Sequence, residues 1–389
     1  MSDNSILIGL AGDVLVDRET PRTVFEKVQS VLDTPDILFA NLEGPYTDNP
    51  HAAPSAGVAV IPGYHNLDVF ASAGFDVMSM ANNHIVDAGH AVMLETRQRL
   101  NKLGVATCGV GKNIAEAREP AIVETKGIKV AFLSYSSIFP FGYEARENVP
   151  GLAPMRAYNH YHDAYPNYQA PGIEPRIETI PDQSDLENLG EDIAKAHERA
   201  DLVITTFHWG DFMKPFFLTD HETRTARFCI DHGADMVVGH HHHILRGMEW
   251  YNGKPIFYGL GHFVFDLRAE IPSEIYDMLG KRGDDPSFYG IAPREGWPLM
   301  PLHADSRMTV LAWATVTDGK IDAIGFLPCR LTPEGAVIAV DPTSPEGKEV
   351  VDYVEKGCTS QGLNARIEAE GAIELAGHPT ARILPVETG

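Results

Sequence analysis

Residues 235–243, DMVVGHHHH, place an apolar, valine-rich segment directly before a glycine and four consecutive histidines. Short apolar runs of this kind are typical of β-strands that are buried on both faces, so we expect a strand at Met236–Gly239. The histidine run is internal and is followed by ILRGMEW, so it is not a terminal expression tag. Side chains able to bind a metal therefore begin where this strand ends.

Similar apolar segments recur along the chain and alternate with segments whose apolar residues are spaced three or four positions apart. This alternation is typical of strands joined by crossover helices, and it predicts an α/β fold. The expected strands are Ile6–Ala11, Ile37–Ala40, Val77–Met80, Ala121–Glu124, Lys129–Ser134, Leu202–Phe207, Met236–Gly239, Ile256–Gly259, Met308–Val316 and Ile321–Phe326. The expected helices are Pro21–Leu32, Leu67–Ala73, His90–Leu103, Leu186–Glu198 and Asp220–Asp231.

Composition limits the functional classes. The chain has 389 residues, 44% of them hydrophobic and 22% charged, and it has no run of the roughly 20 apolar residues that a membrane span needs. The net charge of −23 argues against a nucleic-acid partner, because binding to phosphates depends on Lys and Arg. The N-terminal MSDNSILIGL carries an acid where a secretory signal carries basic residues, so we interpret it as a first strand.

The four cysteines are far apart and form no C-x-x-C pair, which favours a reducing, cytoplasmic location. The expected partner is a small-molecule substrate, with no membrane and no nucleic acid. A homo-oligomer stays open.

Two segments rich in Pro and Gly, 139–183 and 267–306, interrupt the alternation. We expect one domain over 1–330 with these segments as inserted loops, and 331–389 as a C-terminal extension packed on it, with a helix near Gly347–Lys356. Long ordered loops are often lids or binding loops. Tyr143, His160 and His162 in the first insertion are therefore candidate substrate-binding residues, with simple loop packing as the alternative.

Carboxylates follow the first two expected strands. Asp13 comes directly after Ile6–Ala11 and Gly12, and Asn41 and Glu43 follow the strand ILFA. Taken alone, each is more often a turn or helix-capping residue. Asn41 and Glu43 are two positions apart and share a face of an extended segment, so Glu43 is a candidate bridging ligand and Asn41 a candidate substrate contact.

Amide and imidazole side chains follow two further strands. Asn83 and His84 come after VMSM, and His208 ends LVITTF. Asn83 offers an amide oxygen to a metal, while His84 is a candidate acid or base and Asp87 a candidate residue to orient it. A lone histidine such as His208 is more often a core residue, but its place at another strand end favours a ligand.

The histidine run supplies the strongest metal signal. In extended backbone, residues two apart point the same way, so His241 and His243 are candidate ligands, while His240, facing elsewhere, is a candidate substrate contact. Strand ends at one edge of an α/β sheet are where sites are built. A mixed oxygen and nitrogen ligand set without thiolate suits manganese first, with zinc or iron as alternatives, better than calcium.

The motif order GD, NLEG, NNH, HWG, GHHxH and KPIFYGLGHFVFD resembles the CapA family of capsule and poly-γ-glutamate synthesis proteins, related to calcineurin-like metallophosphoesterases, over about residues 5–330. The resemblance implies a four-layer α/β/β/α sandwich with one or two divalent metals at one edge of its sheets. It also implies roles for the motif residues: Asp13 and His243 on a first metal, Glu43 bridging, Asn83, His208 and His241 on a second, and His84 as acid or base.

The chain departs from the pattern of these relatives at three positions. Leu15 stands where metallophosphoesterases carry the histidine of D-x-H, and His242 stands where CapA relatives carry proline. His262 stands where relatives carry asparagine and is a further candidate substrate-binding residue. Capsule-synthesis members are typically membrane-anchored, whereas we expect no anchor here and a role in soluble metabolism.

The expected function is hydrolysis of a small phosphoester, amide, lactam or ester by water activated on the metal, with His84 assisting the leaving group. One alternative is a metal-independent acid/base epimerase or isomerase on the same scaffold. Another is a non-catalytic accessory protein of capsule or poly-γ-glutamate synthesis.

Overall fold

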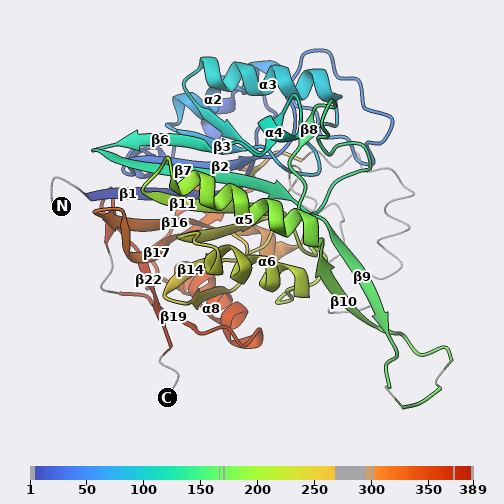
Figure 1. Cartoon of the computed structure of the whole chain (residues 1–389). Coiled ribbons are helices and arrows are strands. Elements are labelled where there is room, and N and C mark those ends of the chain that lie inside the picture. The colour runs from blue at the N-terminus through green and yellow to red at the C-terminus, as the bar shows by residue number, and fades with distance from the viewer. Residues whose placement is uncertain are drawn as a thin grey trace.

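Two β-sheets form the centre of the protein. The computed structural model describes residues 5–386 except 166, 170, 268–295, 298, 300–301 and 371–372. The ten-stranded sheet has the order β19-β22-β17-β16-β1-β2-β3-β4, with β15 paired to β1 and β18 to β17, and the six-stranded sheet has the order β13-β14-β12-β11-β7-β6 (Figure 1). The ten-stranded sheet consists of β1 (Ser5–Leu15), β2 (Ile37–Leu42), β3 (Val77–Ser79), β4 (Ala106–Cys108), β15 (His262–Phe265), β16 (Met308–Thr317), β17 (Lys320–Leu331), β18 (Val337–Ala339), β19 (Ala365–Glu368) and β22 (Ala381–Pro385). The six-stranded sheet consists of β6 (Ala121–Thr125), β7 (Ile128–Ser136), β11 (Leu202–His208), β12 (Met236–His240), β13 (Met248–Tyr251) and β14 (Lys254–Phe257).

Helices connect the parallel strands and lie on the outer sides of the sheets (Figure 1). The α-helices are α1 (Gln29–Leu32), α2 (Asp68–Ser72), α3 (His90–Lys102), α4 (Ile114–Ala117), α5 (Gln183–His197), α6 (Asp220–Asp231) and α8 (Pro345–Ser360). Short 3-10 helices are η1 (Pro21–Val24), η2 (Tyr64–Asn66) and η3 (Ala304–Arg307). Helix α6 begins with a capping box between Thr219 and Glu222, which satisfies N–H groups at its first turn.

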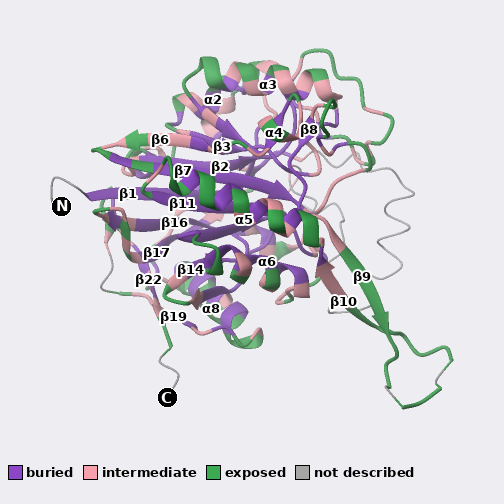
Figure 2. Cartoon of the chain, in the orientation of Figure 1, coloured by how far each residue is buried: buried purple, intermediate pink, exposed green. Residues whose placement is uncertain are grey.

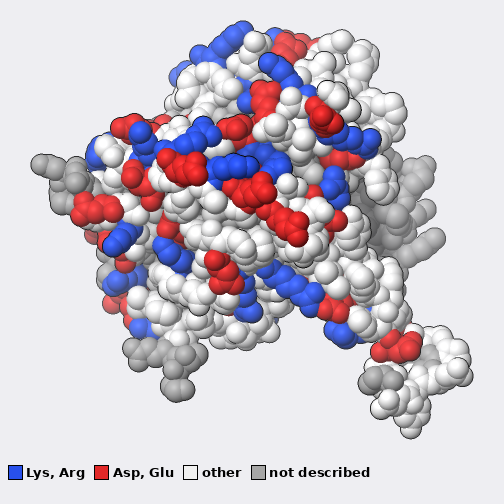
Figure 3. Space-filling model, viewed as in Figure 1, with Lys and Arg blue, Asp and Glu red and all other residues white. Residues whose placement is uncertain are grey.

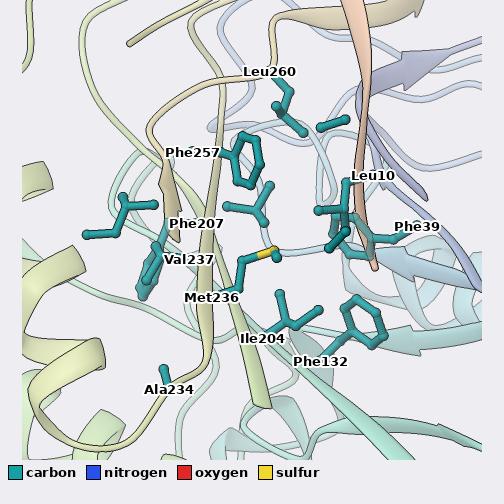
Figure 4. Packing of buried hydrophobic residues seen from close by; sticks show 14 of the residues in the cluster. Leu10, Phe39, Phe132, Ile204, Phe207, Ala234, Met236, Val237, Phe257 and Leu260 are labelled. Atoms are coloured by element: carbon teal, nitrogen blue, oxygen red, sulfur yellow. The ribbon is translucent and has the colours of Figure 1, made fainter. Parts of the chain in front are cut away.

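The alternation of β1 divides its side chains between two cores. Ile6, Ile8 and Leu10 enter the core between the sheets, whereas Leu7 and Ala11 enter the core under α2 and α3. In the first core Leu10 and Phe39 of the large sheet face strands of the small sheet (Figure 4), and the rings of Phe39 and Phe132 stack at 5.2 Å. The strands are buried and the helices expose one face (Figure 2).

The α/β class expected from the sequence is confirmed. Helix α8 packs against β17 and β19 of the large sheet and also against β13 of the small one. The strict four-layer order therefore stays a prediction. Residues after 331 add β18, β19 and β22 to the ten-stranded sheet.

The structure corrects two local expectations and leaves a third largely untested. The helix expected at Pro21–Leu32 is two short pieces, η1 and α1, separated by turns in a segment with β-branched Val24 and Val28, which have lower helix propensity. The first insertion has regular structure: β8 (Gly151–Leu152) pairs with β5 (Val110–Gly111), and a hairpin projects from the body. Of the second insertion, most of 267–306 lies outside the described residues.

That hairpin consists of β9 (Ala157–His162) and β10 (Arg176–Pro181). A smaller two-stranded sheet joins β20 (Glu374–Leu375) to β21 (His378–Pro379).

On the face shown in Figure 3, acidic and basic side chains are interspersed rather than gathered by sign. Among the helices of the described part of the chain, none has the length and apolarity that crossing a membrane requires.

Candidate metal centre

The carboxyl ends of parallel strands bring the candidate residues together. In the large sheet Asp13 on β1 is the register partner of Asn41 on β2, which is in turn the partner of Ser79 on β3. In the small sheet His208 at the end of β11 pairs with His240 at the end of β12. Both sets of strands point toward one edge, so residues far apart in the sequence meet there.

Asn41 organises the two carboxylates. Its Nδ2 donates to Asp13 Oδ1 at 2.8 Å and to Glu43 Oε2 at 2.9 Å. Its Oδ1 accepts from Ser79 Oγ at 3.1 Å and from Asn82 Nδ2 at 3.2 Å. Asn41 is therefore not placed to contact a substrate as expected, because its side chain is buried and its amide is hydrogen-bonded to protein groups.

His208 lies at the centre of a second group of ligand atoms. Its Nε2 lies 2.7 Å from Asn83 Oδ1, 3.0 Å from His241 Nδ1 and 3.6 Å from Glu43 Oε1. Two ligand atoms that each lie about 2.1 Å from one ion are about 3.0–3.4 Å apart at the usual angles. The spacing of this group is therefore close to that of a coordination shell.

The two oxygens of Asp13 face different surroundings. Oδ1 lies beside Asn41 and 3.4 Å from His240 Nδ1, whereas Oδ2 accepts from the backbone N–H of His241 at 3.2 Å and lies 3.5 Å from His243 Nδ1. His240 is buried, and its ring packs at 5.8 Å against Phe39 in the core between the sheets. His240 thus orients Asp13 from behind and does not face a substrate, which corrects the expected role.

The backbone of the histidine run is not extended. Strand β12 ends at His240, and His241 and His243 have φ angles of +91° and +55°. Non-glycine residues in this region are strained, and such strain gathers at functional sites. Both imidazoles lie beside other candidate ligands as expected, His241 next to His208 and His243 next to Asp13. The expected cause, an extended backbone that aligns the two rings, is wrong. His242 turns away, and its Nε2 lies 2.9 Å from Glu222 Oε1.

The pKa values of the two carboxylates are shifted in opposite directions by their neighbours. Burial raises the pKa of Asp13, but the interaction with His240 and the hydrogen bond from the Asn41 amide outweigh it and leave this pKa below its ordinary value. Burial and the charge of Asp13 raise the pKa of Glu43 well above its ordinary value. The two carboxylates repel one another, so a cation placed between them would be favoured.

The imidazoles are held neutral. Burial lowers the pKa of His208, His241 and His243 well below the ordinary value, and the charge of His84 lowers all three further. Neutral imidazole is the form that binds a metal. Glu43 Oε1 and His243 Nδ1 are buried and have no hydrogen-bond partner among the described residues. These donors fit a divalent cation, and ligand atoms of Asp13, Glu43 and His208 all lie within 4.8 Å of one another.

His84 stands at the more accessible side of the cluster. Its Nδ1 lies 2.7 Å from Asp87 Oδ2, and its side chain is 16% exposed. Asp87 Oδ2 also accepts from the backbone N–H of Val60, and Oδ1 accepts from the Tyr143 hydroxyl at 2.8 Å. Tyr143 is buried, so it holds Asp87 and indirectly His84, which corrects its expected role as a substrate contact.

The two histidine candidates of the first insertion lie away from this group, whereas Leu15 and His262 lie on strands beside it. The strand β9 belongs to the projecting hairpin (Figure 1). His160 and His162 on this strand are exposed, and His162 pairs with Glu178. They do not join the cluster, because a hairpin that leaves the body cannot bring these rings to the sheet edge. Leu15 is buried in the apolar core under α2 and α3. His262 is fully buried, and its backbone pairs with that of Asp13.

Three supporting residues escaped the sequence analysis. Ser79 and Asn82 hold Asn41, and Phe212 lies edge-on to the rings of His241 and His243 at 5.6 and 6.3 Å. The lone hydroxyl within VMSM was a signal for Ser79. No sequence pattern marks Phe212, since its position depends on how the loop after His208 folds.

Fold and cluster together define a class: an α/β protein with a buried, mixed oxygen and nitrogen candidate metal centre at a sheet edge. The family model described as bacterial capsule synthesis protein PGA_cap matches residues 7–267. The chain belongs to this family.

Named relatives have moderate identity. The PGA biosynthesis protein CapA of Bacillus subtilis (strain 168) is 27% identical over 277 residues, covering 68% of this chain and 64% of that protein. A probable polyglutamine synthesis accessory protein of Mycobacterium tuberculosis (strain ATCC 25618 / H37Rv) is 28% identical over 238 residues, covering 60% of this chain and 57% of that protein. The chain thus matches less than two thirds of the length of either relative.

Among solved structures, calcineurin-like phosphoesterase YfkN from Bacillus subtilis superposes with a TM-score of 0.39 at 13% identity, covering 92% of this chain and 98% of that chain. A likeness at this level carries no conclusion about activity.

Proposed function

We propose that this chain is a metal-dependent hydrolase. Asp13, Glu43, Asn83, His208, His241 and His243 hold one or two divalent cations. The observation that carries the proposal is that Asp13 on β1, Glu43 directly after β2 and His208 on β11 bring ligand atoms within 4.8 Å of one another in the interior. Burying two carboxylates without a cation is costly, which favours metal binding.

The donor set favours manganese, with zinc or iron as alternatives. Carboxylate, amide and imidazole donors suit these ions, whereas softer metals select thiolate. The four cysteines are buried, and burial raises the pKa of Cys108, Cys229 and Cys329 to about 12. Those thiols stay protonated and do not compete as ligands.

A divalent cation bound there would supply Lewis-acid polarisation of the substrate and activation of water. Asn41 holds the carboxylates in place, and the buried surroundings strengthen every charge interaction inside the cluster. His84, held at Nδ1 by Asp87, presents its other nitrogen to protonate a leaving group or to stabilise developing charge. The substrate class is a small phosphoester, amide, lactam or ester. The relatives' names in capsule and PGA synthesis support including the amide-type bonds.

Elemental analysis of full-length protein purified without chelator tests this proposal. We expect stoichiometric manganese, zinc or iron, and hydrolysis within a panel of phosphate, amide, lactam and ester substrates that depends on added Mn²⁺. The exposed His162→Asn variant serves as the control and should keep its metal. Protein that is active but free of metal would contradict the proposal and favour acid/base epimerisation or isomerisation.

The printed name of the Mycobacterium tuberculosis relative supports a second candidate, a non-catalytic accessory role in capsule or poly-glutamate synthesis. His84→Ala separates the two, because His84 is placed for chemistry rather than for metal binding. If cells that carry this variant in place of the wild-type chain keep their phenotype, the accessory role is favoured. Loss of the phenotype with metal still bound favours catalysis.

A further inference from the structure

At Oδ2 of Asp13 the histidine run places one imidazole, that of His243, because His240 lies against Oδ1 and packs on Phe39 in the core. Asp13 Oδ2 and His243 Nδ1 lie 3.5 Å apart, whereas the His208 side combines two imidazoles, an amide and a carboxylate. Leu15, two residues beyond Asp13 on β1, cannot supply a donor, because it carries no polar atom and packs in the apolar core. A cation beside Asp13 therefore needs a ligand from another element.

Strand β15 brings His262 to that side. β15 runs parallel to β1, and His262 at its start is the register partner of Asp13. His262 is fully buried, and its ring lies 5.9 Å from the ring of His243. Both rings pack against the ring of Phe265, with centroid distances of 5.1 Å for His262 and 4.6 Å for His243. The imidazoles of His243 and His262 thus pack on the same phenyl ring, close to the buried carboxylate of Asp13.

The surroundings of His262 suit a ligand. The ring hydrogen-bonds the backbone of Ser306, and metal-binding histidines commonly use one nitrogen in this way, which fixes the direction of the other. Burial lowers the pKa of His262 to about 4, although the charge of Asp13 acts the other way. The imidazole is therefore neutral at physiological pH.

We propose that His262 is a ligand of a first cation, together with Asp13 and His243, and that it takes the place of the donor that Leu15 lacks. This inference rests on the proposed function, because it assumes that the cluster binds divalent cations. It adds that the protein holds two ions, and that His262 is needed for one of them while Asn83, His208 and His241 serve the other.

The test is Mn²⁺ binding to full-length, metal-stripped protein, measured by calorimetry and by elemental analysis after gel filtration. We expect two ions for wild type. The His262→Asn variant should bind one Mn²⁺ ion as tightly as wild type does. It should bind the second ion at least about tenfold more weakly. His208→Asn should lose the other ion, and exposed His162→Asn should match wild type.

Each result has a distinct meaning. A His262→Asn protein that binds two ions with wild-type affinity overturns the inference while leaving the proposed function intact. A wild-type protein that binds no ion overturns both. Should His262→Asn fail to fold, crystals of wild-type protein soaked in Mn²⁺ decide: an anomalous peak within bonding distance of the His262 ring supports the inference, and its absence there contradicts it.

Discussion

Acidification should destabilise the metal-free protein strongly between pH 6.5 and 5. Six buried histidines among the described residues have a lowered pKa chiefly because burial disfavours the charged ring: His208, His221, His241, His242, His243 and His262. In the unfolded chain these rings bind protons near pH 6.5. Below that pH the unfolded state binds more protons than the folded state, so stability present above pH 6.5 is lost as the pH falls.

The magnitude follows from linkage. At pH 5 a ring in the unfolded chain is about 1.5 pH units below its pKa of about 6.5, so proton binding stabilises the unfolded state by about 2 kcal/mol. When the same ring stays neutral in the folded protein, the free energy of unfolding falls by that amount. The pKa of His262, about 4, meets this condition. The other buried rings add to this loss in the same direction. Glu43 and Glu222 oppose it, because their raised pKa makes the folded state take up a proton as the pH falls.

Guanidinium unfolding followed by circular dichroism, in chelator at pH 7.5, 6.5, 5.5 and 5.0, measures this loss. We expect a steep fall in the free energy of unfolding below pH 6.5. The His242→Gln variant removes one buried ring that pairs with Glu222 rather than with Asp13 or Glu43, and it should show a smaller fall at pH 5 than wild type. The exposed His162→Gln variant should follow wild type. A free energy of unfolding that changes by less than about 2 kcal/mol over this range would refute the reasoning.

Three further predictions concern single side chains. Asn41→Ala should weaken Mn²⁺ binding by about 10–100-fold in calorimetry, because the amide that orients both carboxylates is lost; unchanged affinity would contradict its role. Tyr143→Phe should lower the free energy of unfolding by about 1.5–3 kcal/mol in denaturant titrations, because a buried hydroxyl no longer donates to the Asp87 carboxylate, and it should leave metal content unchanged. Gly12→Ala should destabilise the protein by about 1–3 kcal/mol or more in thermal unfolding, since the added Cβ would lie 2.2 Å from the Gly261 carbonyl oxygen; a wild-type Tm would show that β15 can move aside.

Local pattern predicted much of the fold. Helix α6 begins and ends at the expected residues, Asp220 and Asp231, because its apolar spacing and its capping box are both local signals. Strands such as β11, at Leu202–His208, were recognisable from continuous β-branched runs. The hairpin β9–β10 was not recognised, since β9 is exposed, β10 is only partly buried, and neither strand has the apolar alternation that a core imposes.

The residues of the candidate centre were also visible in the sequence, because Asp13, Glu43, Asn83, His208 and the histidine run all follow apolar strands. Which contacts each of these residues makes was not visible in the sequence. The roles of Asn41 and His240 behind Asp13 depend on strand pairing and on packing between two sheets. The inward turn of His241 and His243 depends on backbone with positive φ, which no local pattern of four identical residues specifies.

The sequence by itself determined the strands, most helices and the chemical types gathered at the strand ends, because these follow from side-chain periodicity over a few residues. Only the tertiary structure decided which of those side chains meet. It placed Tyr143 behind Asp87, moved His160 and His162 away from the centre, and set His262 beside Asp13. The physical reason is that these contacts join residues distant along the chain, and their geometry is fixed by sheet register and by packing between the sheets.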